Sequence, residues 1–289
     1  MKILLLGIFF VCLNTFTGSS FDAITKYLSI NNYKWYHYYS IGGTAAIILF
    51  ILLFFTNGEI KKHLTLKNKN HFYFLILRGI SFIPVLLIVF YSLKYIPISL
   101  FATLIMTSPF FLLIFAKIIL KEKLNYISWV AILVGFCGVL IVLRPSLSNI
   151  NIFIFLVFFA VLIISFNFTI VSKYSHIATS YGFTFYQYLP ITLFAYIFFI
   201  FDPLVPSLKE FILFSSAGVL MMISMWAWNK AYHIAGKYSS IISPFFFTQI
   251  IWGSLYGIIF FSEELSLMSI MGVIVIVISG TIAIYNRNK

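Results

Sequence analysis

Charged residues are scarce in this chain. Asp, Glu, Lys and Arg together make up 9% of its 289 residues, against roughly 25% in ordinary soluble domains. Hydrophobic residues make up 62%, and the mean hydropathy is +1.06. Uncharged stretches recur along the chain, and many are long enough to cross about 30 Å of hydrocarbon as a helix. A soluble core cannot hide this much apolar surface, so the sequence predicts a polytopic membrane protein.

Cysteine and long polar segments are also scarce. The two cysteines, Cys12 and Cys137, lie in apolar stretches, and their number and spacing indicate neither a disulfide framework nor a metal site. The longest polar stretch, NGEIKKHLTLKNKNH at residues 57–71, is too short for a catalytic or nucleotide-binding module. The first residues resemble a secretory signal in composition. We interpret them as a membrane span because no soluble domain follows, so the function is expected to lie within the membrane.

Apolar runs between breakers predict an all-α fold with ten transmembrane helices. Most Lys and Arg residues, Arg78 among them, fall at the helix ends shared with the N-terminus. The positive-inside rule assigns those ends, and with them both termini, to the cytoplasm. The net charge of +12 then faces anionic lipid along the membrane edges, and no motif indicates a nucleic-acid partner. The predicted spans are residues 3–25, 36–57, 72–93, 97–120, 126–143, 152–173, 181–201, 211–232, 239–261 and 266–285.

The chain also matches itself in two registers. FDAITKYL at residues 21–28 aligns with FTIVSKYS at 168–175, and a second offset pairs Thr107 with Thr248 and Glu122 with Glu263. The two copies of SPFF, at 108–111 and 243–246, fit neither register. These matches predict a five-helix repeat at residues 1–145 and a second at 146–289. Because five is odd, the second repeat would enter the membrane from the opposite face, as in transporters with inverted repeats.

Two stretches resemble a known family. They are FYSLKYIPISLFATLIMTSPFFLLIFAKIILKEKL at residues 90–124 and WVAILVGFCGVLIVLRP at 129–145. They are similar to helices of the drug/metabolite transporter (DMT) superfamily, in its ten-helix EamA-like branch, which implies a transporter fold and function. Within that branch FDAITKYL, Arg78 and YIPISLFAT resemble S-adenosylmethionine uptake transporters of intracellular bacteria. Those relatives usually carry an Arg in the second helix, where this chain has Tyr39.

Polar and aromatic side chains at mid-span are the candidate site residues, because polar groups are costly in hydrocarbon. A tryptophan face can hold a cation or a flat ring. The competing interpretation is hydrogen bonding that only holds the bundle, worth about 0.6 kcal/mol per bond. Asp22 and Lys26, spaced i, i+4, are a candidate gating pair or a local ion pair. The predicted substrate-binding residues are Asn14, Tyr91, Thr107, Asn167, Tyr186, Gln187, Trp226, Gln249 and Trp252.

We therefore expect a carrier of the bacterial inner membrane that moves a small organic metabolite by alternating access. The resemblance implies S-adenosylmethionine or an amino-acid-like compound, and an exporter of amino acids or other metabolites is the alternative. A structural membrane protein or an integral membrane enzyme is the alternative of another class. No convergent nucleophiles, paired acids or His ligands support an enzyme, a metal or a cofactor. The expected partners are the substrate and the lipid bilayer, and a homodimer is left open.

Overall fold

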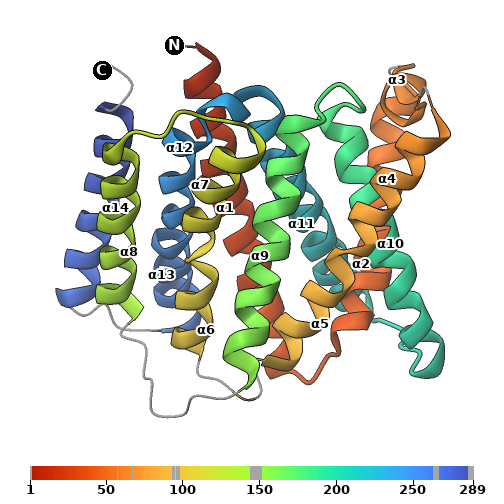
Figure 1. Cartoon of the computed structure of the whole chain (residues 1–289). Helices are drawn as coiled ribbons and strands as arrows, with labels where there is room; N and C mark the ends of the chain where they lie inside the picture. Colours follow the sequence, from red (N-terminus) through yellow and green to blue (C-terminus); the bar gives the residue numbers. More distant parts are fainter. Residues whose placement is uncertain are drawn as a thin grey trace.

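The protein is a single bundle of helices whose long axes run roughly side by side (Figure 1). The computed structural model describes residues 2–56, 58–66, 68–92, 95, 98–143, 152–262 and 267–285. The predicted boundary between the repeats, at residues 145 and 146, lies outside these ranges. The helices are α1 (Lys2–Ile30), α2 (Trp35–Thr56), α3 (Ile60–Leu64), α4 (Lys69–Ile80), α5 (Phe82–Ser92), α6 (Ile98–Ile105), α7 (Ser108–Ile119), α8 (Tyr126–Leu143), α9 (Ile152–Lys173), α10 (Ser180–Phe201), α11 (Leu208–Ala235), η1 (Gly236–Tyr238), α12 (Ser239–Ile242), η2 (Ser243–Phe247), α13 (Thr248–Phe261) and α14 (Leu267–Tyr285).

These elements make the ten traversals that hydropathy predicts. By length and apolar character, eight segments of the described chain could each cross a membrane. One of them, Leu208–Phe261, has 54 residues, about 80 Å of helix, and so crosses twice. The tenth traversal is α14, with 19 residues. The spans predicted at 126–143 and 152–173 coincide with α8 and α9, and the multi-pass membrane fold is confirmed.

Three traversals are interrupted within the membrane rather than continuous. The α4–α5 traversal breaks at Ser81, the α6–α7 traversal turns before Ser108, and the last traversal but one contains the 3₁₀ segment η2. Proline explains two of these breaks, because it lies in the first turn of both α7 and η2 and cannot donate a backbone hydrogen bond. Both copies of SPFF therefore lie at breaks, although they are not equivalent positions.

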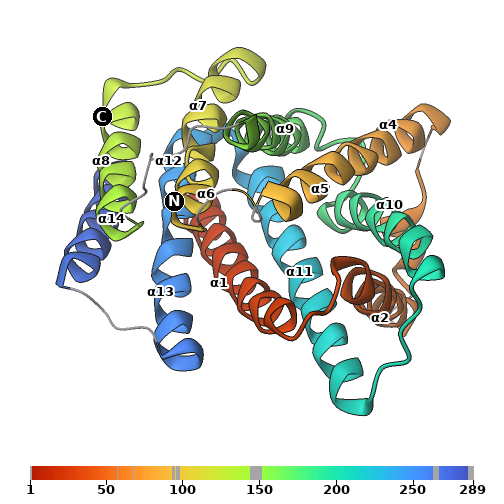
Figure 2. The same cartoon turned by 90° about the horizontal axis from the view of Figure 1, so that it is seen from below.

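Close backbone contacts lock several helices together. A Cβ placed on Gly218 of α11 would lie 2.0 Å from the carbonyl oxygen of Gly42 on α2, and one on Gly138 of α8 would lie 2.8 Å from that of Gly272 on α14. Small residues allow such approach where apolar surface gives no net drive for association in lipid. Seen from below, α8 and α14 form a pair at one edge of the bundle (Figure 2).

Under the predicted repeat, α1, α2 and α8 correspond to α9, α10 and α14, and several helix pairings then recur when the two halves are exchanged. α1 packs on α11 and α13, and its counterpart α9 packs on α5, α6 and α7. α2 packs on α11, and its counterpart α10 packs on α4. α8 pairs with α14 and α2 with α10, each helix with its own counterpart. α1 begins and α14 ends at the same end of the bundle (Figure 1).

Candidate substrate site

The centre of the bundle holds one buried cation, Arg78 on α4. Its side chain is 5% exposed, and among the described residues it is the sole Arg, Lys, Asp or Glu that is buried. The sequence interpretation had placed Arg78 among the charges at the cytoplasmic helix ends, and this is wrong. α4 carries it about ten residues into the apolar segment Lys69–Val89, so it lies within the membrane-spanning part of the chain.

The Arg78 guanidinium is held by uncharged oxygen atoms from three helices of the second half. Its Nε donates to the backbone oxygen of Asn167 on α9 at 3.3 Å. Its Nη1 donates to Oε1 of Gln187 on α10 at 3.1 Å and, at 3.5 Å, to the backbone oxygen of Phe183. Its Nη2 donates to Oδ1 of Asn229 on α11 at 3.0 Å. The positive charge is thus hydrogen-bonded and has no carboxylate partner among the described residues.

The amide groups around Arg78 form one network. Asn229 donates through Nδ2 to Oγ1 of Thr184 at 3.0 Å and to Oε1 of Gln187 at 3.2 Å. Asn167 donates through Nδ2 to Oγ of Ser81, at the α4–α5 break, at 3.0 Å. Since the Gln187 oxygen must face the two donors, its Nε2 points the other way. That Nε2 is buried without a partner, and an unsatisfied buried donor costs about 1–3 kcal/mol.

A pocket of about 550 Å³ adjoins this network, between α4, α7 and α9. Arg78, Ser81 and Asn167 form its polar part. Its volume lies within the range of small-molecule sites, which are mostly apolar with a few placed polar groups. The remaining lining residues are apolar or aromatic: Phe74, Leu77, Phe115, Leu162, Ile163, Phe166, Ile170 and Tyr174.

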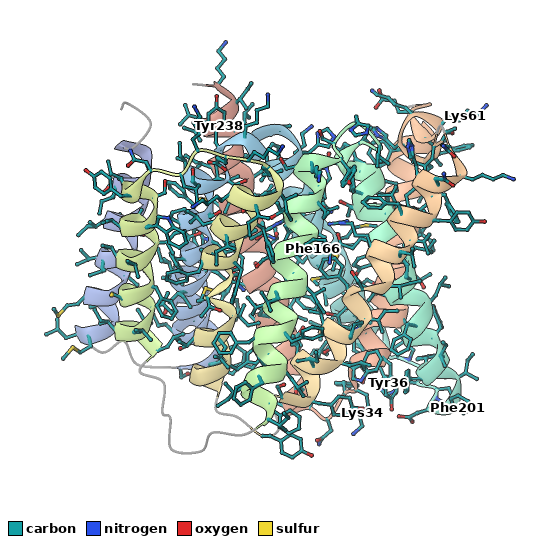
Figure 3. The ribbon with its side chains drawn as sticks, in the orientation of Figure 1. Lys34, Tyr36, Lys61, Phe166, Phe201 and Tyr238 are labelled. Atoms are coloured by element: carbon teal, nitrogen blue, oxygen red, sulfur yellow. The ribbon has the colours of Figure 1, made fainter. Side chains whose placement is uncertain are left out.

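The pocket opens on the side of the bundle rather than at its end. Leu77 and Phe166, which line it, are 66% and 45% exposed, and Phe166 lies near mid-height of the bundle (Figure 3). An uncompensated guanidinium at the base of an apolar pocket attracts anions and hydrogen-bond acceptors and repels cations, strongly because the local dielectric constant is low. The site is therefore electrostatically suited to an anion or a hydrogen-bond acceptor rather than to a cation.

Two predicted site residues, Asn167 and Gln187, belong to this cluster. Tyr186 is adjacent in sequence but points elsewhere, because its hydroxyl donates to the backbone oxygen of Leu64 at 2.6 Å, near α3. Asn14 donates to Oγ and the backbone oxygen of Ser224, joining α1 to α11. The structure thus brings Asn167 and Gln187 together at Arg78, and it places Asn14 and Tyr186 in contacts elsewhere in the bundle.

The other predicted residues lie in separate contacts. Trp226 stacks on Tyr181, and Trp252 packs edge-on against Phe16. The indole nitrogens of both tryptophans are buried without a hydrogen-bond partner. Thr107 donates to a backbone oxygen one turn back, where α6 ends. Tyr91 is 48% exposed. None of the four lines the Arg78 pocket.

The candidate gating pair lies at the contact between α1 and α13. Asp22 accepts a hydrogen bond from Nε2 of Gln249 at 3.2 Å. The Lys26 ammonium lies 4.1 Å from the ring centroid of Phe261. Each charge of the pair therefore contacts α13, and these contacts join the first half of the chain to the second. A gating role for the pair stays a prediction.

The sequence interpretation missed the central residue of the cluster. The signal was present, since an Arg near the middle of an apolar run is a functional candidate by default. Asn229 is a mid-span amide in the sequence, but it was not among the predicted substrate-binding residues. Among the described residues, no group of three or more His, Cys, Asp or Glu side chains could hold a metal ion.

Comparison with known proteins places these features in context. Residues 5–144 match the model of the EamA-like transporter family. The chain is 32% identical over 151 residues to a riboflavin transporter of Vibrio cholerae, covering 52% of this chain and 50% of that protein. It is 25% identical over 199 residues to an uncharacterised transporter of Helicobacter pylori, covering 66% of each. The matched regions thus span about half to two thirds of the length of these curated relatives.

One solved structure resembles the whole bundle. The crystal structure of another protein superposes with a TM-score of 0.77 and covers 98% of this chain and 96% of that chain. The sequences are 13% identical. At this identity the likeness bears on the fold alone, and it agrees with the helical arrangement described above.

Proposed function

We propose that this chain is a membrane carrier for a small organic molecule, because residues 5–144 match the model of the EamA-like transporter family. The observation that carries the proposal is the Arg78 cluster. A lone cation with uncharged partners is costly to bury, and here it lies where α4 of the first half meets three helices of the second. A purely structural bundle gains nothing from a buried charge without a counter-ion, whereas a carrier uses such a charge to attract a substrate.

We further propose alternating access by two inverted repeats, residues 1–145 and 146–289. The exchanged helix pairings support this, as does the position of Arg78 between the halves. A site near the midplane between repeats is the arrangement in which rocking of one half exposes the site to each side in turn. The distribution of lysines and the bacterial relatives support an inner-membrane protein with cytoplasmic termini.

For the substrate, we propose a flat heteroaromatic compound with hydrogen-bond acceptors along one edge. Phe74, Phe166 and Tyr174 offer ring faces, and Arg78 offers its positive charge at the base of the pocket, with four of its five N–H groups bonded to the protein. Riboflavin has this chemistry, and one relative is named as a riboflavin transporter. S-adenosylmethionine and amino acids remain competing candidates, because their carboxylates would also pair with Arg78. The sulfonium cation of S-adenosylmethionine is less suited to an uncompensated guanidinium.

The test is uptake by liposomes that contain the purified protein. Labelled riboflavin, labelled S-adenosylmethionine and a labelled amino acid mixture are offered separately, each with unlabelled competitors. We expect saturable riboflavin uptake that excess S-adenosylmethionine does not reduce. Uptake of S-adenosylmethionine alone would reverse the substrate assignment. Absence of uptake of all three by folded, reconstituted protein would contradict the carrier proposal for these substrate classes.

Variants connect transport to the site. Arg78→Gln removes the charge and should reduce riboflavin uptake at subsaturating concentration by about 10- to 150-fold, the effect of losing a hydrogen bond to a charged group. Arg78→Lys keeps the charge and should retain more activity. Lys117→Gln is the control, because Lys117 is an exposed cation on α7 outside the pocket. Melting temperatures of all three variants separate a transport defect from misfolding.

A further inference from the structure

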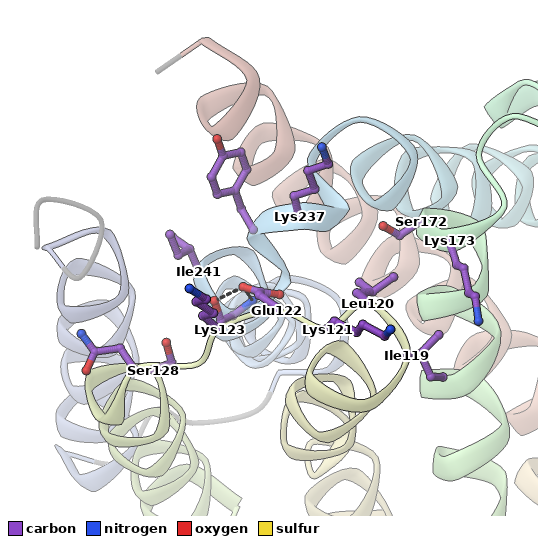
Figure 4. A pocket seen from close by; sticks show the side chains of 13 residues that line it. Ile119, Leu120, Lys121, Glu122, Lys123, Ser128, Ser172, Lys173, Lys237 and Ile241 are labelled. Carbon is purple, nitrogen blue, oxygen red and sulfur yellow. Dashed lines mark hydrogen bonds between the residues drawn. The ribbon is translucent and has the colours of Figure 1, made fainter.

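A second pocket, of about 720 Å³, lies at the end of the bundle where α1 begins and α14 ends (Figure 4). It is formed by the turn between α7 and α8, the start of α8, the end of α9, and the η1–α12 segment. It shares no lining residue with the Arg78 pocket. The two pockets are therefore separate sites, one opening at the side of the bundle and one at its end.

Four lysines from three segments line this pocket. Lys121 and Lys123 come from the α7–α8 turn, Lys173 from the last turn of α9, and Lys237 from η1. All four are exposed. Among the described residues, none of the four ammonium groups forms an ion pair or a hydrogen bond, although Lys173 lies 5.6 Å from the ring centroid of Tyr174. The pocket therefore carries a concentrated positive charge.

The single carboxylate that lines the pocket does not neutralise these lysines. Oε1 of Glu122 accepts hydrogen bonds from the Ser240 hydroxyl and, at 3.2 Å, from its backbone N–H. Glu122 thus ties the α7–α8 turn to the beginning of α12. Its Oε2 is buried and has no hydrogen-bond partner. Four cations against one engaged carboxylate leave an excess that a phosphate group would balance.

The backbone at Lys121 supports a use for its side chain. Lys121 has a φ of 56°, the left-handed conformation that favours glycine at the end of a helix. The following N–H, of Glu122, bonds back to the Ala116 oxygen at 3.1 Å and closes α7. A non-glycine residue costs on the order of 1–2 kcal/mol in this conformation. Residue 121 is nevertheless a lysine, and it lines the pocket.

We propose that this pocket binds the phosphate group of an anionic ligand. Lysine ammonium groups bind phosphate as point charges, and basic residues beside the cytoplasmic leaflet attract anionic headgroups. Ile119, Leu120 and Ile241 line the same pocket and provide apolar contact for the carbon atoms next to a phosphate ester. The phosphate belongs either to a lipid headgroup or to a soluble ester.

A bound phosphate would connect parts of both halves of the chain. The α7–α8 turn lies in the first half, whereas the end of α9 and the η1–α12 segment lie in the second. The ligand would therefore add to the Glu122–Ser240 contact and stabilise the packing of α7 against α12. Binding itself does not depend on transport, so this proposal is tested separately from the carrier function.

The experiment measures binding to the delipidated full-length protein in detergent. Native mass spectrometry compares the binding of phosphatidylglycerol with that of phosphatidylcholine. Calorimetric titration with inorganic phosphate tests whether a soluble phosphate binds. The pocket variant is Lys121→Gln with Lys237→Gln. The control is Lys61→Gln with Lys69→Gln, two exposed lysines of α3 and α4 that lie outside the pocket and give the same change in charge.

We expect wild type and control to prefer phosphatidylglycerol, and the pocket variant to bind it roughly thirtyfold more weakly, since each Lys near a membrane surface contributes about a factor of five. Phosphate binding with the same dependence on the pocket lysines would support the soluble source. Equal losses in the two double variants would mean diffuse surface charge and overturn the proposal. The proposal would also be overturned if the wild type bound phosphatidylglycerol no more tightly than phosphatidylcholine and did not bind inorganic phosphate.

Discussion

Replacing Gln187 by Glu places a counter-charge beside Arg78 without disturbing the network. Oε1 would keep both of its hydrogen bonds, from Arg78 at 3.1 Å and from Asn229 at 3.2 Å. The atom that changes is Nε2, which has no partner to lose. The substitution therefore tests whether the uncompensated charge of Arg78 serves the substrate.

The expected magnitudes follow from electrostatics. Two charges about 4 Å apart attract by about 4 kcal/mol at an effective dielectric constant of 20, and burying the new carboxylate costs several kcal/mol. These terms nearly cancel, so the melting temperature of Gln187→Glu should stay the same or rise slightly. Transport should fall, with KM raised about 10- to 150-fold, because the new carboxylate neutralises the Arg78 charge that would attract the substrate, an effect comparable to losing a hydrogen bond to a charged group.

The assay pairs riboflavin uptake in liposomes with thermal unfolding in detergent. Gln187→Met is the comparison, because it keeps the size of the side chain and removes the oxygen that Arg78 and Asn229 share. That variant should lose both transport and stability. A Gln187→Glu protein with KM within twofold of the wild type would refute the assignment of Arg78 to the substrate site.

Three further predictions follow from the contacts. Asn14→Ala should lower the melting temperature but leave riboflavin KM unchanged, because Asn14 joins α1 to α11 outside the pocket; a raised KM would return Asn14 to the site. Gly218→Ala should sharply reduce the yield of folded protein in size-exclusion chromatography, since its Cβ would lie 2.0 Å from the Gly42 oxygen; normal yield would show that α2 and α11 can separate. Burial raises the pKa of Glu122, so phosphatidylglycerol binding should tighten as pH falls through that raised pKa and the carboxylate is neutralised, and Glu122→Gln should bind tightly at all pH values. The folded protein then holds this proton more firmly than the unfolded chain, so the stability from Glu122 is present at acid pH and is lost as pH rises.

Much of the fold could be predicted because lipid imposes a simple rule on the backbone. Every N–H and C=O group within the hydrocarbon must be satisfied inside its own helix, so each apolar run of sufficient length becomes a traversal. The spans at 126–143 and 152–173 were therefore predicted to the residue. The internal breaks were only partly visible. Proline marks those beside Ser108 and Ser243, whereas the break at Ser81 precedes its nearest proline, Pro84, by three residues.

The site was predicted less well, because it depends on which faces of distant helices meet. Asn14 and Asn167 are both mid-span asparagines in the sequence, yet Asn14 joins α1 to α11 and Asn167 lines the Arg78 pocket. Arg78 was counted with the charges at the helix ends, although the predicted span of residues 72–93 already included it. The true depth of Arg78 follows from α4 beginning at Lys69.

The amino-acid sequence by itself determined the environment, the number of traversals and the likeness to a transporter family, because these depend on composition and on helix length. Only the tertiary structure decided that one guanidinium would lie among the amides of three other helices, and that four lysines from three segments would line one pocket with Glu122. The rotation of each helix about its axis and the close packing at glycine contacts decide which side chains of different helices come together. No periodicity within a single helix carries that information.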